Sequence, residues 1–218
     1  GAALGVEFRI TTTTANNQAS PEVAMDADGD FVVVWQSRSQ DGGGWGIYGQ
    51  RYNSFGTAQG SEFLINTETL KDQVEPSVAM ADDGSFVVTW NSKDQDGDGL
   101  GIYAQCFDSG GTAQGSEFQV NTYTTGEQQR PRAAMDADGD FVITWQSKDQ
   151  DGNLWGVYAQ RYDSSGVAQG SEFKVNTYVT SDQQDPDVAM SSTGSFTIVW
   201  QSMAQDGDSW GIYAQEYD

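Results

Sequence analysis

One long stretch of this chain occurs four times at constant spacing. Its third copy, residues 131–162, reads PRAAMDADGDFVITWQSKDQDGNLWGVYAQRY. Each copy begins 55 residues after the one before it, and each begins at one of the four prolines of the 218-residue chain: Pro21, Pro76, Pro131 and Pro186. A fixed period of this length indicates a repeat architecture in which each repeat is one supersecondary unit.

Each repeat contains four short apolar runs separated by turn residues. In the third repeat these runs are residues 133–135, 141–145, 156–162 and 172–176, and they are rich in Val, Ile, Phe, Tyr and Trp. This composition is typical of β-strands, and no stretch shows a 3.6-residue apolar period bounded by helix caps. We therefore predict four strands per repeat and almost no helix.

The first connection of each repeat is short and carries a glycine at the same place, as in DADGD at residues 26–30. Such a glycine suits a tight hairpin with a positive φ. The same motif resembles an oxygen-rich calcium loop. The fourth copy, SSTGS at residues 191–195, has lost every acid and kept the glycine, which favours the hairpin interpretation.

Four antiparallel strands per repeat is the composition of a propeller blade. The first run, VEFRI at residues 6–10, matches the fourth strand of a repeat, and the last repeat ends after its third strand. We predict an all-β, four-bladed propeller over residues 1–218, in which residues 1–10 complete the last blade by pairing with residues 211–217. An open stack of blades, or part of a larger ring, is the rival arrangement.

The charge balance excludes several classes of function. The chain has 32 acidic residues, 10 basic residues and no histidine, for a formal charge of −22. Such a surface repels nucleic acid and anionic membranes, and no apolar run is long enough for membrane insertion. A histidine-dependent catalytic relay is impossible. Because the paired carboxylates recur in equivalent places in every repeat, we predict that the chain is not an enzyme.

The second connection of each repeat is the best candidate for a ligand site. It contains an invariant Gln-Asp-Gly, followed in three repeats by a tryptophan. An aromatic ring beside amide and carboxylate groups suits a carbohydrate, and four such loops on one face would give repeated sites. The alternative is that the tryptophans pack between blades while Gln and Asp cap the loops. The candidate residues are Gln40, Asp41, Trp45, Gln95, Asp96, Gln150, Asp151, Trp155, Gln205, Asp206 and Trp210.

The same loops offer hard oxygen donors. Aspartates concentrate in the second and third repeats, where calcium could be held together with backbone carbonyls. We predict no required cofactor and at most weak calcium binding. The candidate metal ligands are Asp94, Asp96, Asp98, Asp149 and Asp151.

The pattern P-x-V-A-M-D-x-D-G-x-F-V-V-x-W, followed by Asp-Gly and then G-I-Y-x-x-R-Y, resembles the blade of sialidase-type (BNR) propellers. The likeness covers every repeat and implies a propeller fold. The Asp box of that family is missing, because residues 164–173 read SSGVAQGSEF. The arginine triad and the other catalytic residues of sialidases are not matched either, so sialidase activity is not implied. The repeats are also similar to those of large secreted bacterial surface proteins.

Together these features predict an extracellular or cell-surface binding module without enzymatic activity, lectin-like or adhesive, with a glycan as its partner. The alternative is a structural repeat unit of a surface layer, filament or long adhesin that self-associates. Four glutamines, Gln50, Gln105, Gln160 and Gln215, recur at fixed spacing and have no role that the sequence explains.

Overall fold

The computed structural model describes residue 3 and residues 5–218, and in this part of the chain it contains fifteen strands in four antiparallel sheets and no helix. We call the sheets blades 1 to 4. Blade 1 is β1 (Gln18–Met25), β2 (Phe31–Arg38), β3 (Trp45–Tyr52) and β4 (Ala58–Leu64). Blade 2 is β5 (Gln73–Met80), β6 (Phe86–Lys93), β7 (Leu100–Phe107) and β8 (Ala113–Gln119). Blade 3 is β9 (Gln128–Met135), β10 (Phe141–Lys148), β11 (Trp155–Tyr162) and β12 (Ala168–Lys174). Blade 4 is β13 (Gln183–Met190), β14 (Phe196–Met203) and β15 (Trp210–Tyr217).

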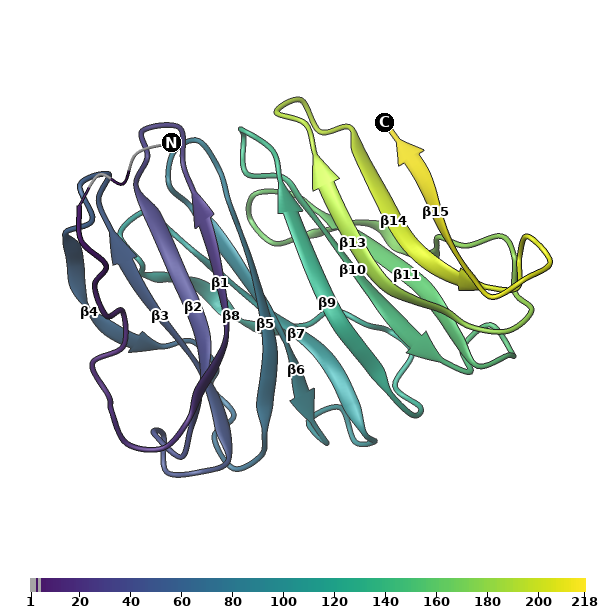
Figure 1. Ribbon diagram of the computed structural model, residues 1–218, viewed down its shortest axis with the longest axis horizontal. Helices are drawn as coiled ribbons and strands as arrows, with labels where there is room; N and C mark the ends of the chain where they lie inside the picture. Colours follow the sequence, from purple (N-terminus) through teal and green to yellow (C-terminus); the bar gives the residue numbers. More distant parts are fainter. Residues whose placement is uncertain (1–2, 4) are drawn as a thin grey trace.

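The four blades are arranged as in a propeller. The first strands of the blades, β1, β5, β9 and β13, lie side by side in that order, and the remaining strands of each blade extend outward from them (Figure 1). The predicted all-β, propeller-type architecture is confirmed. Within the described residues, no helix is long and apolar enough to cross a membrane.

The inner strands begin earlier than the apolar runs predicted. β9 starts at Gln128, so Pro131 lies inside the strand rather than at its entrance. A bulge makes this possible, because the pairing register with β10 shifts between residues 129 and 132. The other three inner strands shift register at the equivalent place. A proline is tolerated within a sheet at such a bulge, since no ladder hydrogen bond is needed from its nitrogen.

The core is divided among the three interfaces between neighbouring blades. At each interface, small and branched apolar side chains of one blade pack against the aromatic face of the next. Between blades 2 and 3, for example, Val87 and Ile102 pack in one cluster with Phe141, Trp145 and Tyr162. Since no helix covers these sheets, each blade can bury its faces only against its neighbours.

The predicted closure of the ring is absent from the structure. Residues 6–10 form no strand, and β15 ends a sheet of three strands in the described part of the chain. The segment instead lies on blade 1, where the rings of Phe8 and Tyr52 are 5.5 Å apart and Thr12 donates to Glu62. β15 lies at the opposite end of the row (Figure 1). Residues 1, 2 and 4 of the proposed closing segment fall outside the described residues.

The strand tryptophans allow a matched test of buried hydrogen bonding. Trp90 and Trp145 are both fully buried, but only Trp90 has a partner in the described residues: its Nε1 donates to Gln73 Oε1 at 2.8 Å. We expect Trp90→Phe to lower the free energy of unfolding by about 1–2 kcal/mol more than Trp145→Phe, because it leaves the Gln73 carbonyl unpaired. Denaturant unfolding measures the difference, and equal losses would contradict the assigned bond.

Candidate functional site

The four inner strands together line a hollow of about 520 Å³. Its wall takes residues from every blade, two or three from each inner strand, and most of them are charged or polar. The polar and charged lining residues are Ser20, Glu22, Glu75, Arg130, Arg132, Asp185 and Asp187.

These lining residues occupy equivalent positions in repeats that are otherwise very similar. The residue before each proline is Ser20, Glu75, Arg130 or Asp185 in the four blades, so four different side chains occupy one position. Two residues further along, the blades carry Glu22, Ser77, Arg132 and Asp187. The repeats therefore diverge in charge where they converge in space, and the hollow has no internal symmetry.

The backbone at this position is strained. Ser20, Glu75, Arg130 and Asp185 have φ angles of 51°, 54°, 57° and 53°, in the left-handed region that residues other than glycine rarely adopt. Such a conformation costs about 1–3 kcal/mol per residue, and it tends to persist at binding and catalytic sites. Here it forms the bulge of each inner strand, next to the hollow.

Two of the carboxylates are held in place by amide side chains. Asn91 Nδ2 donates to Glu75 Oε2 at 2.8 Å, and Gln201 Nε2 donates to Asp185 Oδ2. Asp185 also forms an ion pair with Arg130, which lies on the strand between those of Glu75 and Asp185. The two acids therefore differ in their surroundings, since Arg130 stabilises the negative charge of Asp185.

The Gln-Asp-Gly loops, which the sequence predicted as ligand sites, lie outside the hollow. In blades 1 and 2 the second connection contacts the linker that follows the same blade: Trp45 N donates to Asp72 Oδ1 at 3.1 Å, and Gly126 N donates to Asp98 Oδ2 at 3.0 Å. Glycine is required at Gly43, because a Cβ there would lie 1.7 Å from the backbone carbonyl oxygen of Thr69. No residue of these loops lines the hollow.

The loop glutamines have structural partners. Gln40, Gln95 and Gln150 each donate through Nε2 to a glutamate of the fourth strand: Glu62, Glu117 and Glu172. Ser37 and Ser92 donate to the Oε1 of Gln40 and Gln95. These bonds fasten the loop to the edge of the blade.

The loop aspartates also serve the loop itself. Asp41, Asp151 and Asp206 accept a backbone N–H from two residues further along, and Asp96 accepts from Asn121 as well. Burial, together with the charges of Asp41 and Glu62, raises the pKa of Tyr48 to about 12. The carboxylates therefore lie beside a neutral tyrosine and the backbone.

The tryptophans of these loops, Trp45, Trp155 and Trp210, begin β3, β11 and β15. Trp45 and Trp155 are partly buried, whereas Trp210 is 44% exposed at the end of the row. Their proposed contact with a sugar stays a prediction.

The repeated glutamines have a role that the sequence did not reveal. Gln105 Nε2 donates to the carbonyls of Cys106 and Gln114 at 2.9 and 3.1 Å, and Gln50 and Gln160 make similar bonds. The register between the third and fourth strands of a blade shifts at this place. In blades 1 to 3 the glutamine thus bridges an interruption in the backbone ladder.

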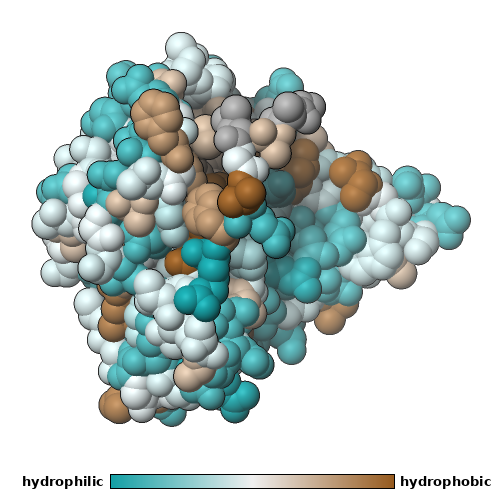
Figure 2. Space-filling model, turned by 60° about the vertical axis from the view of Figure 1, so that its left-hand side comes forward, coloured by the Kyte–Doolittle hydropathy of each residue, from teal (hydrophilic) through white to brown (hydrophobic). Residues whose placement is uncertain are grey.

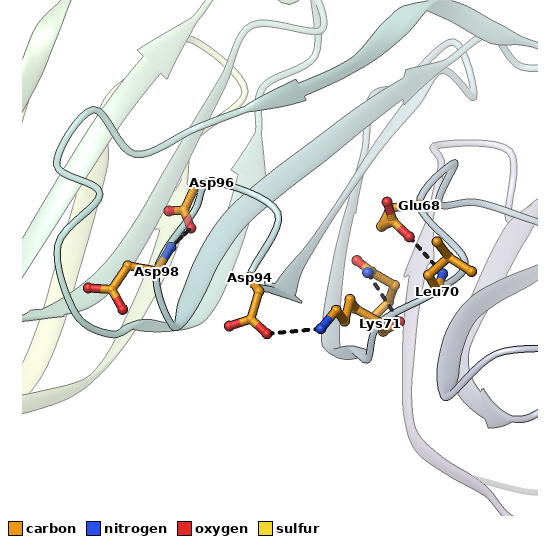
Figure 3. Close-up of polar contacts among 7 residues, drawn as sticks. Glu68, Leu70, Lys71, Asp94, Asp96 and Asp98 are labelled. Atoms are coloured by element: carbon orange, nitrogen blue, oxygen red, sulfur yellow. Dashed lines mark hydrogen bonds and ion pairs between the residues drawn. The ribbon is translucent and has the colours of Figure 1, made fainter.

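The candidate metal ligands point to separate partners. Asp94 forms an ion pair with Lys71 at 3.4 Å (Figure 3). Asp98 accepts from the backbone N–H of Gly126 in the next linker. Among the described residues, no group of three or more acidic or cysteine side chains is placed to hold a metal ion. The exposed Lys71–Asp94 pair adds little to stability. Calcium binding is untested and stays a prediction.

The residues around the hollow were missed by the sequence analysis, although a signal was available. Aligning the repeats at their 55-residue spacing shows that the residue before proline changes from Ser to Glu, Arg and Asp. Recurrence marked a residue as a candidate, so a position at which the repeats differ was passed over.

Comparison with known proteins supports the fold. No family model matches the chain, and no curated protein matches it. Among solved structures, the chain is similar to an endo-arabinase from Bacteroides thetaiotaomicron, with a TM-score of 0.57, 14% identity, and coverage of 97% of this chain and 79% of that one. A Hadza microbial sialidase gives a TM-score of 0.61 at 12% identity, covering 91% of this chain but 44% of the sialidase.

A third similar structure is the GH93 α-L-arabinofuranosidase of Fusarium graminearum with arabinobiose, with a TM-score of 0.56 and 12% identity. The match covers 94% of this chain and 64% of the arabinofuranosidase. At these identities the likeness shows the fold.

The expectation of a non-enzymatic binding or structural module is wrong. It was based on the absence of a unique constellation among similar repeats, yet the hollow gathers one asymmetric set of acids and arginines. Several solved structures that resemble the chain are, moreover, carbohydrate-active enzymes.

We expect calcium to stabilise the chain modestly, chiefly by screening its acidic surface. The measurement is thermal unfolding in millimolar calcium and in sodium chloride of equal ionic strength. A clear excess for calcium that is lost in Asp96→Asn and Asp151→Asn would place a specific site in the second connections. Equal melting temperatures would remove calcium as a specific ligand.

Proposed function

We propose that this chain is a carbohydrate-active enzyme that hydrolyses glycosidic bonds in the central hollow. The observation that carries the proposal is the convergence of four carboxylates and two arginines, all from positions where the repeats differ. Glycosidases commonly need two carboxylates on opposite sides of the scissile bond, one as acid and one as base or nucleophile. Enzymes on similar propeller folds support the same reading.

Glu75 and Asp185 are the pair that we assign to this chemistry. Both occupy the same position of their repeats, and β9 with Arg130 lies between their strands. Glu75 is held by the neutral amide of Asn91 and is the proton donor to the leaving oxygen. Asp185, beside Arg130, is kept as a carboxylate and attacks the sugar or activates a water. Arg132 and Glu22 then contact the sugar hydroxyls.

Substitution of either acid should abolish hydrolysis without unfolding the protein. We expect Glu75→Gln and Asp185→Asn each to lower the rate at least about a hundredfold, because an amide neither donates the proton nor carries the charge. Sugar released from arabinan, xylan and sialosides is measured. Asp82→Asn, on an exposed hairpin turn away from the hollow, is the control.

Two outcomes would contradict the assignment. One is a wild-type chain that releases sugar from none of these substrates. The other is hydrolysis that both variants retain at the wild-type rate. Melting temperatures of all four proteins establish that the comparison is made between folded chains.

We further propose that the loop tryptophans extend the binding surface for a polymer, as suits an extracellular glycan substrate. Blade 2 has Leu100 where Trp155 stands in blade 3, so leucine fits the packing at this position. Trp155→Leu should therefore raise KM for a polysaccharide while leaving kcat and the melting temperature unchanged. An unchanged KM with a lower melting temperature would assign the ring to packing instead.

A further inference from the structure

The two ends of the row of blades have bare apolar faces. On blade 4, Val199 is 37% and Ile212 is 78% exposed, whereas the equivalent Val34 and Ile47 of blade 1 are completely buried by blade 2. At the other end, Val23 of blade 1 is 61% exposed, while the equivalent residue of blade 2, Val78, is buried. Figure 2 brings the blade 1 end forward and shows apolar side chains at the surface among hydrophilic ones.

Blade 4 also lacks a hydrogen-bonding partner that the other blades share. In blades 1 to 3 a glutamate of the fourth strand accepts from the loop glutamine and from the backbone N–H of a threonine in the entering linker. The fourth repeat has the glutamine, Gln205, and the threonine, Thr177. Within the described residues no fourth strand stands beside β15, so no equivalent glutamate is there to accept from Gln205 Nε2 or from the backbone of Thr177.

The missing group is present at the other end of the molecule. Glu7 stands 55 residues before Glu62, within the segment of residues 6–12. Phe8 of this segment lies 5.5 Å from the ring of Tyr52, just as Phe63 of the fourth strand of blade 1 lies 5.7 Å from Phe107 of blade 2. The segment is thus placed as the fourth strand of a blade that would precede blade 1.

The pairing register of the other blades fixes how the two ends would join. In blade 3, Tyr158 and Ala159 of β11 pair with Lys174 and Phe173 of β12. Moved to the fourth repeat, this register sets Tyr213 and Ala214 of β15 opposite Arg9 and Phe8. Glu7 would then lie where Glu172 lies in blade 3, within reach of Gln205 and Thr177.

We propose that the exposed face of blade 4 binds the blade 1 end of a second copy of this chain, whose residues 6–12 pair with β15. The same residue types form all three blade interfaces, and these set the angle between blades. Closure of the ring within one chain would require all three blade interfaces to repack at a different angle, because close-packed cores do not deform continuously. Contact with a second copy adds a fourth interface of the same kind. It is head-to-tail, so it builds either a ring of two copies or a longer chain.

The test uses one substitution at each end. Ile212→Lys puts a charge on the blade 4 face, and Val23→Lys puts one on the blade 1 face. Both positions are largely exposed, so both variants should fold. Val167→Lys, at an exposed turn of blade 3, is the matched control. Mass is measured by light scattering after size exclusion over a hundredfold range of concentration, at salt high enough to screen the −22 charge of each copy.

We expect the wild type and Val167→Lys to have at least twice the 23.6 kDa mass of one chain at high concentration, and each end variant alone to be a monomer. An equal mixture of the two end variants should form one-to-one dimers, because each supplies the end that the other has lost. A wild type that stays monomeric throughout would overturn the proposal and favour closure within one chain. A mixture that stays monomeric, or end variants that associate like the wild type, would also overturn it.

Discussion

The packing of one blade's aromatic face on its neighbour's aliphatic face is the contact on which the whole structure depends. Each blade contains a stacked pair of rings, such as Phe86 and Phe107, with centroids 4.9 Å apart. A phenylalanine from the fourth strand of the preceding blade, here Phe63, completes the group at 5.7 Å. A four-stranded sheet with two apolar faces is unstable alone in water, so the repeats fold only by stacking. The exposed faces at the two ends follow directly from this requirement.

The same stacking explains why the hollow can carry chemistry. Equivalent interfaces place the same part of every inner strand around one space, so the residue before each proline is presented there four times. Where the repeats have the same residue, the arrangement is symmetric and the residue serves the fold. Where they differ, as before each proline, it yields four different side chains facing a common space. The strained bulge supplies that position, since it interrupts the regular ladder of each inner strand.

Much of the fold followed from local signals in the sequence. Strand composition and turn glycines predicted every blade, and the hairpins formed as expected: Gly29 has a φ of 86°, and Asp26 Oδ1 accepts from the backbone of Asp28 and Asp30. Gln40 and Asp41 lie in the second connection of blade 1, as the sequence predicted. Their invariance was interpreted as ligand binding, which stays a prediction, and the structure adds that both side chains hold the loop through hydrogen bonds. An invariant polar residue looks the same in a sequence whether it binds a sugar or its own backbone.

The sequence by itself determined the repeat, the strand content and the acidic surface, because each of these depends on residues close together in the chain. Only the tertiary structure decided how the repeats meet. It placed Glu75, Arg130 and Asp185, each 55 residues from the next, on adjacent strands around one hollow, and it placed residues 6–12 on blade 1 rather than beside β15. The angle between packed blades governs both results. That angle arises from how side chains of different repeats interlock, and no pattern within a single repeat specifies it.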